Sequence, residues 1–134
     1  MRVVLDTNVF ISGIFFGGPP SDILKSWRQS KIQIIFTKEI LEEYQRVGEE
    51  LSAKYPSVNI EPIIELFTIF GDFVETTNIT ETICEDPDDN KFIECAVVSK
   101  SKLIVSGDNH LLNISGYKDI EVLKPREFLD TYLR

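Results

Sequence analysis

The chain opens with RVVLDTN at residues 2–8, a short apolar run followed at once by an acid, Asp6. LIVSGDN at residues 103–109 repeats the arrangement and places Asp108 just after a second apolar run. Short apolar runs bounded by turn residues are typical of strands buried in a parallel sheet. Open α/β sheets bind their ligands beyond the carboxyl ends of such strands. The two stretches therefore predict a parallel sheet with Asp6 and Asp108 at its ligand-binding edge.

Strand-like and helix-like segments alternate along the rest of the chain. Strands are expected over 2–5, 32–36, 73–75, 103–105 and 120–123. Helices are expected over 9–16, 22–30, 38–53, 60–70, 88–100, 109–113 and 125–133. Ser21 and Thr37 are the expected capping residues. The next helix is expected to begin at Asn59 or Ile60 and to end at Gly71. The alternation predicts an α/β protein, a three-layer α/β/α sandwich around a central parallel sheet, with residues 1–134 forming one domain.

The composition, with 43% hydrophobic and 27% charged residues, is ordinary for a globular protein. No apolar stretch reaches the roughly 18 residues of a membrane span, and the N-terminus lacks a signal peptide's apolar segment. We therefore expect a cytoplasmic protein with no membrane partner. The net charge of −8 argues against a broad, non-specific nucleic-acid binder but leaves open a nuclease whose acids gather around cations. Lys25, Arg28 and Lys31 approximate one helical face, which is either a solvated surface or a contact for phosphates.

Helical periodicity sets Glu43 apart from the other glutamates of the 38–53 helix. The apolar stripe of this helix comprises Ile40, Tyr44, Val47 and Leu51. At about 100° per residue, Glu43 lies within that stripe near its edge, whereas Glu42 points into solvent. A carboxylate on the buried side of a helix needs a partner, because an isolated buried charge is costly. Glu43 is therefore a candidate site residue, the alternative being a border glutamate whose head reaches water.

Three aspartates fall in EDPDDN at residues 85–90. Asp86 and Pro87 suit the N-cap and the first position of a helix. Asp88 would then point outward, whereas Asp89 would share a face with Phe92 and look inward over the strand ends. All three acids would also suit the positive end of a helix dipole, which is a purely structural role. We take Asp89 as the candidate site residue, with Asp88 as the alternative.

Small polar residues flank the two acids at the strand ends. Thr7 and Asn8 follow Asp6, and Ser106 precedes Asp108, so their hydroxyl and amide groups can hold a carboxylate or a metal-bound water. Carboxylates gathered at one edge repel each other unless a divalent cation neutralises them, and hard cations choose oxygen ligands. The acids therefore indicate an Mg²⁺ or Mn²⁺ site.

The single histidine, His110, is interpreted as a surface or capping residue. It has no second His or Cys near it in the sequence, as a zinc site would require.

With these motifs in this order, the sequence resembles the PIN (PilT N-terminus) domain family. The resemblance rests on VVLDTNVFISG at 3–13, ILEEYQRV at 40–47, DPDDNKFIECA at 86–96 and LIVSGDNHLL at 103–112. It carries the family's four acids over to Asp6, Glu43, Asp89 and Asp108. It carries the small polar residues over to Thr7 or Asn8, and to Ser106, where the family more often has threonine.

The resemblance implies metal-dependent cleavage of RNA, either single-stranded or structured. Asp6, Asp89 and Asp108 would hold Mg²⁺ or Mn²⁺, and Glu43 would hold metal or orient the attacking water. The subgroup that the chain looks most like contains toxins of prokaryotic toxin–antitoxin pairs, related to VapC-like ribonucleases. Membership would imply a homodimer and, for a toxin, an antitoxin protein as partner.

Two other classes of function fit parts of the sequence. A phosphotransfer receiver would need adjacent acids near its first strand and a later lysine at a strand end. A haloacid-dehalogenase-type phosphatase would need Asp-x-Asp where this chain has Asp6-Thr7-Asn8. A catalytically silent PIN-fold binding or dimerisation module could use the apolar residues 9–16 and 60–73 as its partner surface. Such apolar stripes more often belong to the core, which is what we expect here.

Overall fold

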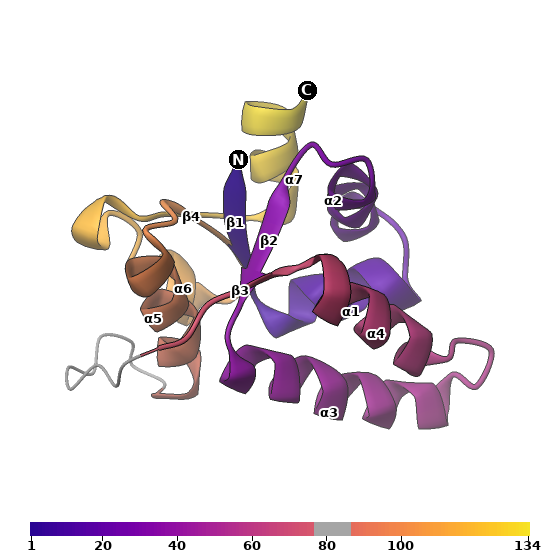
Figure 1. Cartoon of the computed structure of the whole chain (residues 1–134). Coiled ribbons are helices and arrows are strands. Elements are labelled where there is room, and N and C mark those ends of the chain that lie inside the picture. Colours follow the sequence, from indigo (N-terminus) through magenta and orange to yellow (C-terminus); the bar gives the residue numbers. More distant parts are fainter. Residues whose placement is uncertain (77–86) are drawn as a thin grey trace.

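A computed structural model describes residues 1–76 and 87–134 of the chain (Figure 1). At its centre is a five-stranded sheet in which neighbouring strands all pair in parallel. The strands are β1 (Arg2–Leu5), β2 (Gln33–Phe36), β3 (Asp72–Phe73), β4 (Leu103–Val105) and β5 (Glu121–Leu123). Each lies at one of the predicted positions, so the parallel sheet is confirmed.

The strand order, β3-β2-β1-β4-β5, creates a break in the winding of the chain. The sheet grows from β1 in one direction as far as β3, and the chain then returns to place β4 on the other side of β1. β1 and β4 therefore flank a topological switch point, where open α/β sheets bind ligands beyond the carboxyl ends of the strands. Asp6 directly follows β1 and Ser106 directly follows β4, so both residues lie at this point.

Helices cover both sides of the sheet (Figure 1). On one side α5 (Asn90–Ser99) contacts β1, β2 and β4, and on the other α1 (Thr7–Phe15) contacts α2 (Pro19–Arg28) and α3 (Lys38–Lys54). The remaining helices are α4 (Ile60–Phe70), α6 (Asn109–Leu112) and α7 (Pro125–Phe128). Short 3₁₀ turns occur at Pro87–Asp89 and Tyr117–Asp119, and a π-helical turn at Leu129–Leu133. This is the predicted three-layer sandwich.

The ends of α3 and α4 follow the signals in the sequence. Thr37 caps α3, because its hydroxyl oxygen accepts a hydrogen bond of 3.3 Å from the backbone N–H of Ile40. Asn59 caps α4 by accepting a hydrogen bond of 3.2 Å from the backbone N–H of Glu61. α4 ends before Gly71, as expected. Local capping chemistry therefore decides where these two helices begin.

The start of α2 differs from the prediction. The helix begins at Pro19, ahead of the predicted cap Ser21, and Gly18 takes the N-cap position with a positive φ of 83°. Proline is preorganised for a first helical turn and needs no N–H partner there, so the Gly-Pro-Pro sequence starts the helix instead of preceding it. α2 also ends at Arg28, which leaves Lys31 outside the predicted basic helical face.

Two later helices are also less regular than predicted. The helix expected over 88–100 begins as the 3₁₀ turn at Pro87–Asp89 and continues as α5. Its predicted cap, Asp86, lies outside the described residues. The helix expected over 125–133 is α7 followed by the π-helical turn at Leu129–Leu133.

An aromatic cluster of Phe10, Tyr44 and Phe67 packs α3 against α1 and α4, and Tyr44 also connects α3 to β1. The ring of Phe10 stacks on that of Tyr44, with centroids 4.1 Å apart and planes at 6°, and Phe67 packs 4.8 Å from Phe10. The buried Tyr44 hydroxyl donates a hydrogen bond of 2.5 Å to the carbonyl oxygen of Leu5, at the end of β1. Burial of rings this large contributes much of a domain's stability. Because Glu43 precedes Tyr44, this anchor holds Glu43 beside the carboxyl end of β1.

One side of α4 is exposed, contrary to the expectation that the apolar 60–73 segment is core. Ile64 and Phe67 are buried, but Leu66, Ile69 and Phe70 are 52%, 70% and 69% exposed. One face of α4 packs on α3 and the rest of the apolar stripe reaches the surface. Despite these apolar side chains, none of the helices in the described ranges has the length and apolar character required to cross a membrane.

Candidate active site

Asp6 lies at the junction of β1 and α1 and is 6% exposed. Its Oδ1 accepts a hydrogen bond of 3.3 Å from the backbone N–H of Asn8, which makes Asp6 the N-cap of α1. Its Oδ2 accepts a hydrogen bond of 2.5 Å from the hydroxyl of Ser106. Its backbone N–H donates to the carbonyl oxygen of Val105, at 3.0 Å. Asp6 is thus fixed by both strands of the switch point.

The environment of Asp6 disfavours its charged form. Burial raises the pKa of Asp6 above 3.8, and the negative charges of Asp108 and Glu43 raise it further. The hydrogen bonds from Ser106 and the Asn8 backbone oppose the rise. A cation beside Asp6 would reverse the balance, because an opposite charge at short distance favours the ionised carboxylate.

Asp108 is positioned by the turn that follows β4. Its backbone N–H donates a hydrogen bond of 2.9 Å to the hydroxyl oxygen of Ser106, which itself is fully buried. The Oδ1 of Asp108 accepts a hydrogen bond of 2.8 Å from the backbone N–H of His110 and so caps α6. The Ser106 hydroxyl therefore links Asp6 and Asp108 through one oxygen.

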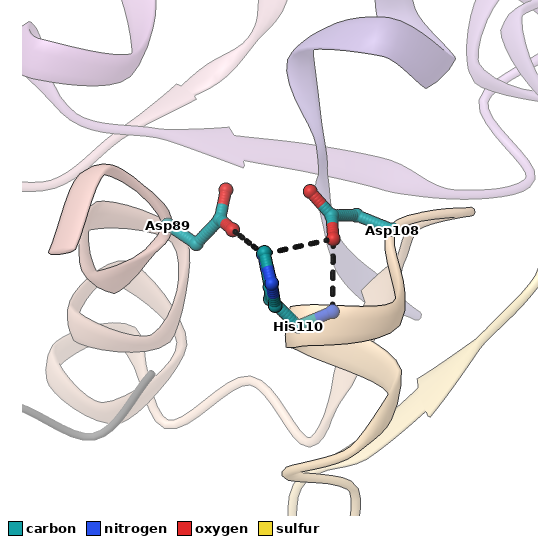
Figure 2. A group of neighbouring side chains, drawn as sticks. All are labelled: Asp89, Asp108 and His110. Carbon is teal, nitrogen blue, oxygen red and sulfur yellow. Dashed lines mark hydrogen bonds and ion pairs between the residues drawn. The ribbon is translucent and has the colours of Figure 1, made fainter. Parts of the chain in front are cut away.

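Asp89 faces Asp108 across the ring of His110 (Figure 2). The Nδ1 of His110 is 3.7 Å from Asp89 Oδ2 and 3.5 Å from Asp108 Oδ1. One ligand atom from each of the three residues lies within 4.8 Å of the others. Two carboxylates and an imidazole at this separation have the donor chemistry that a divalent cation such as Mn²⁺ prefers.

Glu43 reaches the site from α3. Its Oε2 accepts a hydrogen bond from the hydroxyl of Thr7, the residue after Asp6. Its Oε1 accepts a hydrogen bond of 2.8 Å from the ammonium group of Lys91 and lies 3.8 Å from the guanidinium of Arg46. The side chain of Glu43 is only 18% exposed. The interpretation of Glu43 as an inward-facing acid agrees with this burial, and Glu42, with a 64% exposed side chain, faces solvent.

The structure therefore brings Asp6, Glu43, Asp89 and Asp108 to one end of the sheet. Asp89 is buried and Asp88 is exposed, which favours Asp89 as the third acid. Of the small polar residues, Thr7 and Ser106 bond the acids through their hydroxyls. Asn8 contributes through its backbone N–H, while the residue itself is exposed.

Sequence reasoning missed two residues at the site, His110 and Lys91. His110 has a 41% exposed side chain, as a surface residue would, but its ring lies beside two of the acids. Its position two residues after Asp108, at a helix start, was the available signal. Lys91 carries no such signal, because its meeting with Glu43 depends on how α5 packs against α3.

Comparison with known proteins supports the resemblance. The sequence matches a family model described as PIN domain over residues 2–110, a range that includes all four acids. An uncharacterized protein of Methanocaldococcus jannaschii is 31% identical over an alignment of 145 positions, which spans 98% of this chain and 92% of that protein. PIN domains are generally metal-dependent nucleases. Because the PIN domain model spans most of the chain, this chain belongs to the PIN domain family.

Proposed function

We propose that this chain is a metal-dependent endoribonuclease that hydrolyses phosphodiester bonds in single-stranded or structured RNA. The observation that carries the proposal is the meeting of Asp6, Glu43, Asp89 and Asp108 at the switch point of the sheet. Four carboxylates in one place oppose folding through mutual repulsion, and a divalent cation removes that repulsion. Their arrangement therefore supports chemistry rather than stability as their purpose.

Each acid has a distinct role in this proposal. Asp6, Asp89 and Asp108 would hold Mg²⁺ or Mn²⁺ through carboxylate oxygens, with the His110 ring beside them. When bound, the cation supplies charge stabilisation for the phosphate and acidifies water. Glu43, oriented by the Thr7 hydroxyl, either joins the ligands or accepts a hydrogen bond from the attacking water.

The test is cleavage of a mixed-sequence RNA in Mn²⁺ by the wild type, Asp89→Asn and Asp88→Asn. We expect Asp89→Asn to lose cleavage by about a hundredfold or more, because a metal ligand is removed. The exposed neighbour Asp88 is the matched control, and its variant should cleave like the wild type. The reverse order would overturn the assignment of the third acid. A wild type that binds Mn²⁺ but cleaves neither RNA nor DNA would favour the catalytically silent binding module.

The exposed side of α4 supports a protein partner as well. Together with α1 and α2 it borders a groove of about 850 Å³, to which Ile63, Leu66 and Phe70 contribute apolar surface. Exposed Lys25 and Arg28 of α2 also line it, in a chain whose net charge is −8. An amphipathic helix carrying acidic residues complements both features. We propose that the occupant belongs to an antitoxin, and that this nuclease is the toxin of the pair.

The chain's single tryptophan, Trp27, lines the same groove, so its fluorescence reports occupancy. If a small gene lies next to this one, adding its protein product should shift the Trp27 emission, and no shift would contradict the antitoxin proposal. Leu66→Glu should weaken that complex by about tenfold or more, because a charge is buried against apolar surface. Thr68→Glu, also on α4 but not lining the groove, is the control. A shift on concentrating the wild type alone, with a doubled mass in light scattering, would show instead that a second copy fills the groove.

A further inference from the structure

Lys91 is an unusually buried lysine at the edge of the acidic site. Its side chain is 16% exposed, and its ammonium group donates a hydrogen bond of 2.8 Å to Glu43 Oε1. The two residues come from different helices, α5 and α3. Lysine is rarely buried to this extent without a partner, and here the partner is one of the four acids.

The position of Lys91 in its helix is not what stability of α5 alone would select. Lys91 is the second residue of α5, which continues the 3₁₀ turn at Pro87–Asp89, so it lies toward the N-terminal end of this helical segment, where the helix dipole does not stabilise a cation. Its ammonium group instead lies against Glu43, so its charge is placed beside one of the acids of the candidate site. We therefore attribute the position of the Lys91 ammonium group to its attraction to the acids and not to the stability of α5.

The two carboxylate oxygens of Glu43 have different hydrogen-bond partners. Oε2 is bound by the neutral hydroxyl of Thr7, next to Asp6, whereas Oε1 is bound by the charged ammonium of Lys91. The Thr7 bond can keep the carboxylate in place if Oε1 changes partner. Of the two oxygens, Oε1 is therefore the one whose partners, Lys91 and Arg46, are both cations.

We propose that Lys91 is a positioning residue that acts as an internal counterion for the acidic site and competes with the divalent cation for Glu43. In the absence of the cation, Lys91 neutralises part of the carboxylate repulsion and keeps Glu43 in place. When a cation is present, Lys91 opposes its binding by charge repulsion, and so sets the cation concentration that the enzyme needs. This inference rests on the proposed function, since it assumes that the acids bind a divalent cation.

The test is calorimetric titration of Mn²⁺ into the wild type and Lys91→Gln, in the absence of RNA. The glutamine amide can still donate a hydrogen bond to Glu43 but carries no charge. We expect Lys91→Gln to bind Mn²⁺ about tenfold more tightly than the wild type, because one positive charge beside the site is gone. Lys91→Arg should restore near-wild-type affinity.

Arg46 provides the matched control. Its guanidinium is also near Glu43 Oε1, at 3.8 Å, but its side chain is 63% exposed and solvent screens its charge. Arg46→Gln should therefore change Mn²⁺ affinity by less than about twofold. In a metal-free melting experiment, Lys91→Gln should melt below the wild type, and saturating Mn²⁺ should narrow that difference.

The outcomes separate this inference from the proposed function. If the wild type binds Mn²⁺ and Lys91→Gln binds it equally or more weakly, Lys91 is only a structural ion-pair partner and the inference fails, while the nuclease proposal stands. If Lys91→Gln does not fold, Lys91→Met replaces it in the same titration. If the wild type binds no Mn²⁺, the proposed function itself is overturned, and this inference with it.

Discussion

At the scale of single residues, Asp6 combines a structural and a chemical role. Its Oδ1 caps α1, and its Oδ2 receives the Ser106 hydroxyl that also contacts the backbone of Asp108. A capping aspartate gains from its charge, but this one is buried beside other acids, which raises its pKa. The ionised Asp6 side chain is thus positioned to bind a cation, but it destabilises the folded protein when no cation is bound.

The pH dependence of stability should show this conflict. Because the folded-state pKa of Asp6 lies above 3.8, its ionised form destabilises the cation-free protein at neutral pH, and the destabilisation fades as the pH falls through the raised pKa toward 3.8. Asparagine caps a helix as well as aspartate does. We expect Asp6→Asn to increase the free energy of unfolding at neutral pH by about 1 kcal/mol.

Urea unfolding in chelator, over a range from acidic to neutral pH, measures both parts of this prediction. The stability gain of Asp6→Asn should shrink toward acidic pH, where the wild-type carboxyl is protonated. A variant less stable than the wild type at neutral pH would contradict the assignment of Asp6 as a strained carboxylate.

At the scale of elements, the helix that Asp6 caps is fixed by close packing on its neighbour. At Gly13, in α1, an added Cβ would lie 2.8 Å from the carbonyl oxygen of Pro20 and 2.6 Å from Leu24 Cδ1. The two helices can approach this closely only because Gly13 has no side chain. The contact holds α1, and with it the Asp6-Thr7 junction, at a fixed position over the sheet.

Gly13→Ala should therefore destabilise the protein although alanine is the better helix former. The Pro20 oxygen belongs to the backbone and cannot move without moving α2, so we expect a loss of about 1–3 kcal/mol. Gly107→Ala is the control, because a Cβ there meets nothing within 4 Å. Chemical denaturation of both variants measures the difference. A Gly13→Ala protein as stable as the wild type would show that α1 and α2 can separate without cost.

Features that depend on near neighbours in the chain were predictable from the sequence, whereas contacts between distant residues were not. The burial of Glu43 followed from helical periodicity and the cap Thr37 from local hydrogen bonding, because both depend on near neighbours in the chain. The start of α2 at Pro19 was missed because Gly-Pro-Pro is compatible with either a turn or a first helical turn. The contact between Lys91 and Glu43 was missed because it joins residues far apart in sequence.

The exposure of Phe70 was missed for a different reason. An apolar stripe on a helix has the same periodicity whether it faces a core or a partner protein, so its surroundings decide between them. In this fold α3 covers only part of α4, and Ile63, Leu66 and Phe70 border the groove beside α2.

At the scale of the whole molecule, the net charge of −8 opposes RNA binding. The four acids of the candidate site are part of that charge, and they lie where the phosphate would have to approach. Without a cation, the acids repel the RNA phosphate, because like charges at short distance repel strongly where solvent access is limited. A divalent cation at the site would attract the phosphate instead.

RNA binding should therefore depend on divalent cations. We expect the wild type to bind a single-stranded RNA oligonucleotide about tenfold or more weakly in excess chelator than in Mn²⁺, at ionic strength matched with NaCl. Fluorescence anisotropy of a labelled oligonucleotide measures the affinities of the wild type in both solutions, and gel electrophoresis checks that the oligonucleotide is intact when the anisotropy is read. Equal affinity in chelator would show that RNA binds elsewhere on the molecule.

The most direct test of the central claim is calorimetric titration of Mn²⁺ into the wild type and Asp108→Asn, because the proposed nuclease requires these acids to bind a cation. Asp108 lies beside both Asp89 and the Ser106–Asp6 pair, so its loss removes a ligand at the centre of the site. The account predicts Mn²⁺ binding by the wild type and binding weakened by about a hundredfold in Asp108→Asn. Equal Mn²⁺ binding by the two proteins, or none by the wild type, would contradict it.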